Sequence, residues 1–331
     1  MPHRKTGEQT RVILGLSAAI VAVQDGQPLI LAVPRHGHKR ERADFLPFGP
    51  FNPVAHRTME MGLRAWVEEQ TGLKLGYVEQ LYTFGDRGRH AKPEDQGSHE
   101  VSVGYLALAR EAAATGPGSW RRWYEFFPWE DWRGGKPAIL DEQIEPLLRQ
   151  WAALPETNPG KAQGLGRQER LRLFFGLDGL PWDEEGVLER YELLYEAGVV
   201  PEARRDGRGN ADLENAPALP LLGQSMQHDH RRILATAMGR LRGKLKYRPV
   251  IFELMPPEFT LYELQRAVEA ISGGHLHKQN FRRLVEKGRV VEPTGSVSTR
   301  TGGRPAALFR FRREVLRERP APGLRVKAIK G

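Results

Sequence analysis

Two helix signals joined by a glycine turn, between Phe259 and Gly288, constrain the fold of this chain more than any other stretch. Thr260 is a typical N-cap residue, and Gly273-Gly274 is expected to end the first helix. The apolar residues between them recur at spacings of three and four, as one buried helix face requires. They are Leu261, Leu264, Val268 and Ile271. A second helix with one apolar side is expected to follow, and Gly288 is expected to stop it.

Two short strand signals follow the second helix. Val290-Val291 and Ala307 to Phe311 flank a polar, glycine-rich run from Thr294 to Arg304. Two helices, a tight turn between them and a basic hairpin after them make a winged helix-turn-helix. The sequence therefore predicts this fold for the C-terminal part of the chain.

The polar side of the second helix carries the groups that a DNA-reading helix needs. A recognition helix must offer hydrogen-bond donors away from its own core, because base edges present acceptors in the major groove. The candidate DNA-binding residues are Lys278, Gln279, Asn280, Arg282 and Arg283 on this helix, with Arg300 and Arg304 in the hairpin loop. The alternative is a solvated face, which charge runs usually are. An Asn beside two Arg, with two more Arg in the wing, favours DNA.

Five motifs in a fixed order lead to a family resemblance. Between Asp229 and Phe311 the chain reads DHRRIL, LRGKLKY, FTLYELQ, KQNFRR and RPAALFRF. This order resembles the Nudix-related transcriptional regulators of bacterial NAD metabolism, of the longer alphaproteobacterial type. The stretches Glu79 to Gly85 and Val101 to Leu108 resemble the Nudix half of the same regulators. The resemblance implies a Nudix-fold sensor joined to a DNA-binding winged helix.

Charge is unevenly divided along the 331 residues. The net charge is +9; residues 231 to 331 hold 23 Lys and Arg against 8 Asp and Glu, or +15, which leaves −6 for residues 1 to 230. This division indicates that the C-terminal part binds nucleic acid. The sequence has no cysteine, which excludes disulfides and thiolate metal sites and fits a cytoplasmic protein.

The N-terminal apolar run, Val12 to Val23, is too short to span a bilayer. With the turn at Gln24 to Gln27 and a second apolar run at Leu29 to Val33, it predicts two strands rather than a signal peptide. Further strands are expected at Phe45 to Phe51, Leu75 to Phe84 and Val101 to Leu108. We therefore expect no membrane association.

A helix expected at Met59 to Gln70 tests whether the Nudix half is an enzyme. In the hydrolases that it resembles, this region reads G-x5-E-x7-R-E-U-x-E-E-x-G-U, with U apolar, and the glutamates hold Mg²⁺. We anchored this pattern on Gly72 and Leu73, so that the box covers residues 49–73. The pattern then places Ala65-Trp66 at R-E, Glu69-Gln70 at E-E, Arg57 at the outer glutamate, and Gly49 two positions too far upstream.

Only one expected carboxylate is present, and Mg²⁺ needs several hard oxygen ligands in near-octahedral geometry. We therefore expect no catalytic residue and no metal site. The alternative is a rebuilt site in which Glu68 and Glu69 act with Glu60 or Glu100. A cleft that holds a nucleotide without cleaving it acts as a sensor.

The candidate ligand-binding residues of this cleft are arginines suited to phosphates and aromatic residues suited to a base. They are Arg35, Arg87, Phe48, Trp66, Phe84 and Tyr105. Ordinary surface or core packing is the competing interpretation for each. The resemblance implies NAD, ADP-ribose or ATP as the effector, and no cofactor is expected.

A segment of more than a hundred residues lies between the two resembling parts. Its aromatic run, Trp120 to Trp132, favours a packed subdomain or an interface. Helix signals follow at Asp141 to Leu154, Arg167 to Phe175 and Asp183 to Ala197. We expect a helical insertion that serves dimerisation or a second ligand site. A longer helix from Gln227 to Leu245 follows, with Asp229 as its N-cap or first-turn acid rather than as a metal ligand with its two His neighbours.

Together these patterns predict an α+β chain with a Nudix-type α/β/α sandwich and mixed sheet, a helical insertion, and a C-terminal winged helix-turn-helix. The expected division is 1–115, 116–226, a linker helix at 227–248, and 249–331. We expect a repressor of NAD-biosynthesis genes that binds operator DNA as a homodimer, because one recognition helix covers a half-site. The alternatives are an active Nudix hydrolase with a DNA-tethering module and a nonspecific nucleic-acid binder.

Overall fold

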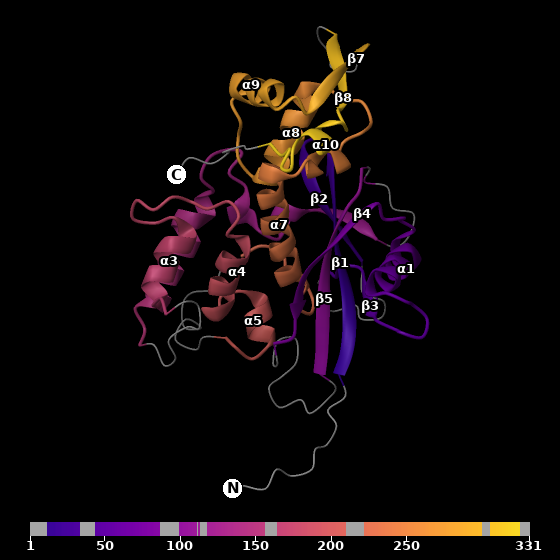
Figure 1. Ribbon diagram of the computed structural model, residues 1–331. Helices are drawn as coiled ribbons and strands as arrows, with labels where there is room; N and C mark the ends of the chain where they lie inside the picture. Colours follow the sequence, from indigo (N-terminus) through magenta and orange to yellow (C-terminus); the bar gives the residue numbers. More distant parts are fainter. Residues whose placement is uncertain are drawn as a thin grey trace.

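The computed structural model describes residues 12–33, 44–86, 99–110, 112, 118–155, 164–209, 222–299 and 305–324. A mixed sheet in the order β4-β5-β1-β2-β6 lies at its centre, with β3 also paired to β1 (Figure 1). β1 (Val12–Gln24) is parallel to β5 (His99–Leu108) and antiparallel to β2 (Gln27–Ala32) and β3 (Phe48–Pro50). The outer strands, β4 (Tyr77–Phe84) and β6 (Ser119–Arg122), pair antiparallel with β5 and β2.

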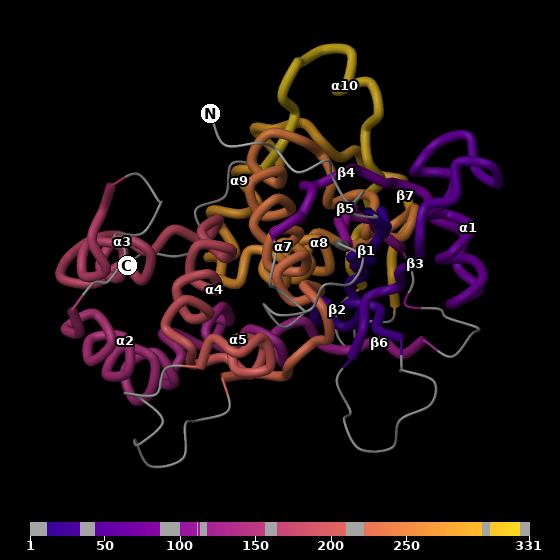
Figure 2. The backbone as a smooth tube through the Cα atoms, turned by 90° about the horizontal axis from the view of Figure 1, so that it is seen from below, coloured from indigo at the N-terminus to yellow at the C-terminus, as the bar shows by residue number. Residues whose placement is uncertain are grey.

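The side chains of β1 divide between two cores, because successive residues of a strand point to opposite faces. Leu16, Ala18 and Ile20 belong to the core under α1 (Met59–Thr71). Ala19 and Val21 belong to the other core, under α7 (His230–Tyr247). Figures 1 and 2 show the sheet between these two helices. The expected α/β/α sandwich with a mixed sheet is confirmed.

The insertion adds a layer beyond α7 (Figure 2). Its helices are a π turn (Leu140–Ile144) that continues into α2 (Glu145–Ala152), then α3 (Arg167–Phe175), α4 (Val187–Glu196) and α5 (Pro201–Arg205). The first four lie where helix signals were found, whereas α5 and β6 were not expected. β6 has no apolar alternation, and it forms because the edge of β2 offers backbone hydrogen-bond partners.

The aromatic run after β6 points inward. Two short 3-10 turns (Trp123–Glu125 and Pro128–Glu130) direct Trp123, Phe126, Phe127 and Trp129 into the protein, where all four are fully buried. These side chains share one core with α7 and the C-terminal helices. The packed subdomain expected from the aromatic run is therefore continuous with its neighbours.

The C-terminal part has the expected order of elements. It contains a 3-10 turn (Val250–Glu253), α8 (Leu261–Ser272), α9 (Lys278–Gly288), β7 (Val291–Ser298), β8 (Ala306–Phe311) and α10 (Val315–Glu318). Thr260 and Glu263 form a capping box at the start of α8, and Gly273 ends the helix with a left-handed φ of 79°. The winged helix-turn-helix prediction is confirmed. β7 extends into the run that was expected to be a loop.

Two helix ends differ from the sequence-based expectation. The left-handed residue after α9 is Arg289 rather than Gly288, and the side chains of Arg312 and Arg319 bind the carbonyls of Arg289 and Gly288. Asp229 occupies the N-cap position of α7 but makes no capping hydrogen bond. Its carboxylate lies 3.3 Å from Arg232 instead. No helix within the described residues is long and apolar enough to cross a membrane.

Candidate functional site

The polar face of α9 is turned away from the core. Phe281 and Val285 are buried, whereas the five candidate DNA-binding residues of the helix are exposed: Lys278, Gln279, Asn280, Arg282 and Arg283. Within the described part of the chain, neither Arg282 nor Arg283 has a carboxylate within ion-pair distance. Both guanidinium groups are therefore accessible to phosphates and base edges. Arg300 and Arg304 lie outside the described residues.

The wing is fastened to the segment that precedes α8. The backbones of Phe259 and Phe309 exchange two hydrogen bonds of 2.9 and 2.8 Å. The rings of Phe252 and Phe311 stack with centroids 4.3 Å apart. The hairpin of β7 and β8 is thus held at a fixed position beside α8 and α9.

At two positions of α1 where a hydrolase carries metal-binding glutamates, this chain carries Trp66 and Gln70. Their side chains form hydrogen bonds to β3. The Gln70 amide accepts from the Phe48 N–H (3.1 Å) and donates to the Phe48 carbonyl (2.6 Å). Trp66 Nε1 donates to the Pro50 carbonyl (3.0 Å). The Trp66 ring also covers Gly49, where an added Cβ would lie 2.3 Å from it. These side chains join α1 to β3 and supply no oxygen for a metal ion.

The glutamates of α1 have surroundings other than β3. Glu60 pairs with Arg64 at 2.8 Å, and Glu68 lies 3.7 Å from Lys74. Glu69 is exposed. Among the described side chains, no three His, Asp or Glu are grouped closely enough to hold a metal ion. The loss of the metal site stays a prediction.

The candidate ligand-binding aromatic residues fall into two groups. Phe48 and Trp66 are half-buried, but the Phe48 ring lies beside His228 and His230 at the start of α7 (centroids 5.5 and 5.1 Å apart), whereas the Trp66 ring covers Gly49 on the α1 side. Phe84 and Tyr105 are 2% and 4% exposed, and burial raises the pKa of the Tyr105 hydroxyl, with a smaller contribution from Glu60.

Phe84 and Tyr105 lie in different cores, on opposite faces of the sheet. One base therefore cannot stack on both of them, because the sheet separates the two rings. The role of each candidate in ligand binding stays a prediction. Arg35 and Arg87 lie outside the described residues.

Several basic residues of α7 pair with acids of the preceding segments, whereas Arg240 is exposed. Arg231 is fully buried and binds the Glu202 carboxylate (3.2 Å). Lys246 pairs with Glu184 (3.0 Å). Lys244 pairs with Glu79. These three cations neutralise acids of the first 230 residues, so part of the C-terminal positive charge is used inside the protein.

A fully buried ion cluster joins α7 to the insertion. Glu130 lies 2.6 Å from Arg190 of α4 and 2.7 Å from Arg242 of α7. Burial opposes ionisation of Glu130, but the two guanidinium groups outweigh it and hold the pKa of this carboxyl below its usual value. Sequence analysis missed the cluster because its members are 60 and 112 residues apart. The one signal was a charged residue inside a run of aromatic residues expected to be buried.

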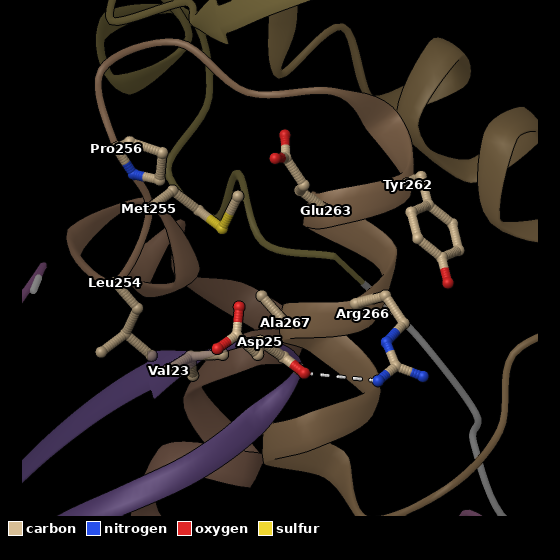
Figure 3. Close-up of a pocket in the computed structure, with 10 residues that line it drawn as sticks. Val23, Asp25, Leu254, Met255, Pro256, Tyr262, Glu263, Arg266 and Ala267 are labelled. Atoms are coloured by element: carbon tan, nitrogen blue, oxygen red, sulfur yellow. Dashed lines mark hydrogen bonds between the residues drawn. The ribbon is translucent and has the colours of Figure 1, made fainter. Parts of the chain in front are cut away.

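Two cavities lie where the sheet meets the C-terminal helices. The first, of about 390 Å³, is lined by residues of the β1–β2 turn, of the segment before α8, and of α8 itself (Figure 3). Arg266 of α8 reaches across it to the Asp25 carbonyl (3.5 Å). The second, of about 440 Å³, shares Gly26 and Arg266 with the first and adds His275 of the turn before α9. Both therefore lie at a junction between sensor and winged helix, away from α1.

Comparison with known proteins agrees with this geometry. Residues 251–311 match the family model described as the NrtR DNA-binding winged helix domain. The chain is also 46% identical over 83 residues to an "ADPR responsive transcriptional repressor NtrR" of Acinetobacter baylyi. That stretch is 25% of this chain and 33% of the relative, so the chain spans about a third of the length of the curated relative that it matches.

Solved structures show the same fold over most of the chain. Shewanella oneidensis NrtR complexed with a 27mer DNA matches with a TM-score of 0.51 and 20% identity, over 91% of this chain and 94% of that one. A MutT/nudix family protein from Enterococcus faecalis matches with a TM-score of 0.51 and 14% identity, over 93% and 90%. The resemblance to Nudix-related regulators that the motifs indicated is confirmed for the winged helix and for the fold.

Proposed function

We propose that this chain, whose residues 251–311 form a winged helix domain of the NrtR type, is a ligand-responsive transcriptional repressor. The observation that carries the proposal is the exposed polar face of α9 on a winged helix of that family. Arg282 and Arg283 are suited to the two acceptors of guanine, and Asn280 to the acceptor and donor of adenine. The target is operator DNA of NAD-biosynthesis genes.

The effector is ADP-ribose, with NAD and ATP as the alternatives. The Acinetobacter relative is described as responsive to ADPR, which supports this choice. The half-buried ring of Trp66, over Gly49 of β3, and the half-buried ring of Phe48, beside His228 and His230, are two alternative surfaces for a base, and Arg35 and Arg87 are the proposed phosphate-binding residues. No cofactor takes part.

The sensor has no hydrolase activity in this proposal. Trp66 and Gln70 use their polar atoms to hold β3, and neither supplies the carboxylate that Mg²⁺ requires. Trp66→Glu adds one carboxylate but leaves Gln70 and Arg57 in place, so this variant is expected not to hydrolyse ADP-ribose with Mg²⁺. Mg²⁺-dependent product release by the unaltered protein would instead establish the hydrolase alternative.

Three further parts of the proposal follow from DNA recognition. The protein acts as a homodimer on a palindromic site, because α9 covers only a half-site. It works in the cytoplasm, where a bacterial operator is located. The division at residues 115, 226 and 248 separates sensor, insertion, linker helix and DNA reader.

A mobility-shift titration tests the proposal. The probes are DNA from upstream of NAD-synthesis genes and an unrelated duplex of equal length, each at one fixed salt concentration, with and without ADP-ribose, NAD or ATP. We expect preference for the first probe and a change in its affinity with ADP-ribose. Equal affinity for both probes would identify a nonspecific binder and contradict the proposal.

A further inference from the structure

The C-terminal end of α8 receives hydrogen bonds from outside the winged helix. The last carbonyls of a helix have no partner within it and need donors from elsewhere. The Tyr124 hydroxyl of the insertion donates to the Ala270 carbonyl (2.8 Å). Arg242 Nε of α7 donates to the Ile271 carbonyl (3.0 Å). Both donors are buried, so the end of α8 is held by groups that water does not replace.

The turn that follows α8 is also fitted against the insertion. The Trp132 N–H donates to the Gly273 carbonyl (2.7 Å). A Cβ at position 273 would lie 2.6 Å from the Glu130 carbonyl oxygen and 3.0 Å from the Tyr124 hydroxyl. Only glycine fits this contact, and its φ of 79° is one that glycine adopts without strain. The chain reaches Lys278, the first residue of α9, directly after this turn.

The insertion segment that makes these contacts is anchored to the sensor sheet at both ends. Its start, β6, pairs with β2 from Leu29↔Arg122 to Ala32↔Ser119. At its other end, Arg133 donates to the Gly26 carbonyl of the β1–β2 turn (2.7 Å). We name residues 119–133 the coupling arm.

The buried ion cluster makes the coupling arm stiff. Glu130 belongs to the arm, and its two oxygens accept from Arg190 (2.6 Å) and Arg242 (2.7 Å) with none of the three side chains exposed to solvent. A shift of the arm relative to α4 or α7 separates buried charges, which is unfavourable. The arm therefore moves with its neighbours or not at all.

We propose that the coupling arm transmits a change in the sensor sheet to the recognition helix, with the Tyr124–Ala270 hydrogen bond as one of its links. The inference rests on the proposed function, because it names the route by which the effector alters DNA affinity. A ligand changes DNA affinity only if it favours one of two arrangements of the molecule. The arm contacts both the sheet and the turn before α9, so a shift of the sheet also shifts this turn.

Tyr124→Phe removes the link while the buried ring stays. Tyr195→Phe is the matched control, because the Tyr195 hydroxyl is also buried in the insertion but donates to Asp206 of the same segment (2.8 Å). Hydrogen–deuterium exchange of the full-length protein is the first measurement. We expect amides of residues 274–281 to exchange roughly two- to tenfold faster in Tyr124→Phe, the factor for one hydrogen bond. We expect no change there in Tyr195→Phe.

Operator binding with and without ADP-ribose is the second measurement. The effect of ADP-ribose is expressed as the ratio of the larger to the smaller operator dissociation constant in these two conditions. This ratio should fall by roughly two- to tenfold in Tyr124→Phe and stay at the wild-type value in Tyr195→Phe. Unchanged exchange at 274–281 in Tyr124→Phe overturns the link, whatever the DNA results are. A wild-type ratio in Tyr124→Phe overturns the transmission even if exchange increases. Absence of any operator preference in the wild type removes the proposed function, and the transmitting role with it, while the exchange data still decide whether the arm holds the turn.

Discussion

Helices α7 and α9 both carry several Lys and Arg, but they direct these residues to opposite environments. In α9 they are exposed, and Arg282 and Arg283 have no acidic partner in the described part of the chain. In α7, Arg231 and Arg242 are fully buried, and each binds a carboxylate and backbone carbonyls. A basic run in the sequence thus corresponds to an exposed face in one helix and, for Arg231 and Arg242, to buried ion pairs in the other.

The difference follows from what surrounds each helix. α9 packs on one side only, so its cations remain solvated at little cost. α7 lies between the sheet and the insertion helices, so its polar residues need internal partners. The acidic residues of the first 230 positions provide them. The following predictions separate the two uses, from the largest expected effect to the smallest.

Glu130→Gln should have the largest effect, since it leaves Arg190 and Arg242 buried without a counter-charge. We expect a loss of about 3–5 kcal/mol in the free energy of unfolding, measured by urea titration. Glu60→Gln is the control, because Glu60 pairs with Arg64 at the surface, and its loss should stay below about 1 kcal/mol. Equal effects in the two variants would show that the buried cluster contributes no more than an exposed pair.

The same cluster should respond to acid. Burial opposes the charge on Glu130, but Arg190 and Arg242 lower its pKa below the ordinary value of 4.5. Its stabilising contribution is therefore fully present above that pH and is lost as the pH falls through the lower, folded-state pKa. The difference in unfolding free energy between wild type and Glu130→Gln should be constant near neutral pH and shrink in acid. A difference that stays constant or grows as the pH falls below 4.5 would contradict the lowered pKa.

Arg283→Ala should weaken operator binding by about 1–3 kcal/mol, or roughly 5- to 150-fold, without a change in unfolding free energy. Arg282→Ala should act in the same way. Arg172→Ala, an exposed arginine on α3, is the control and should bind as the wild type does. Retained operator preference in both α9 variants would mean that another surface reads the DNA.

Lys246→Met should have the smallest effect on DNA binding. Lys246 is a cation of α7 that pairs with Glu184 and Glu185, so it has no role in contacting phosphates. We expect operator affinity within about twofold of wild type and an unchanged salt dependence. Removal of a phosphate-binding cation would instead reduce the slope of log binding constant against log salt concentration by about one. A reduced slope in Lys246→Met would show that α7 also contributes to the DNA-facing charge.

The sequence by itself determined the features that depend on neighbouring residues. The helical spacing of Leu264, Val268 and Ile271, the cap at Thr260 and the glycine at 273 predicted α8 because each acts within a few residues. The exposed face of α9 followed from the burial of Phe281 and Val285 on its other side. The missing carboxylates at Trp66 and Gln70 were equally visible, since a metal site depends on residue types at set spacings.

Only the tertiary structure decided which charges face solvent and which groups meet across the chain. Glu130, Arg190 and Arg242 are ordinary charged residues in the sequence, and they become partners because folding brings together segments that lie 60 and 112 residues apart. The hydrogen bond from Tyr124 to Ala270 spans 146 residues. Local periodicity carries no information on such pairs, because their energy depends on burial and geometry that only the packed chain creates.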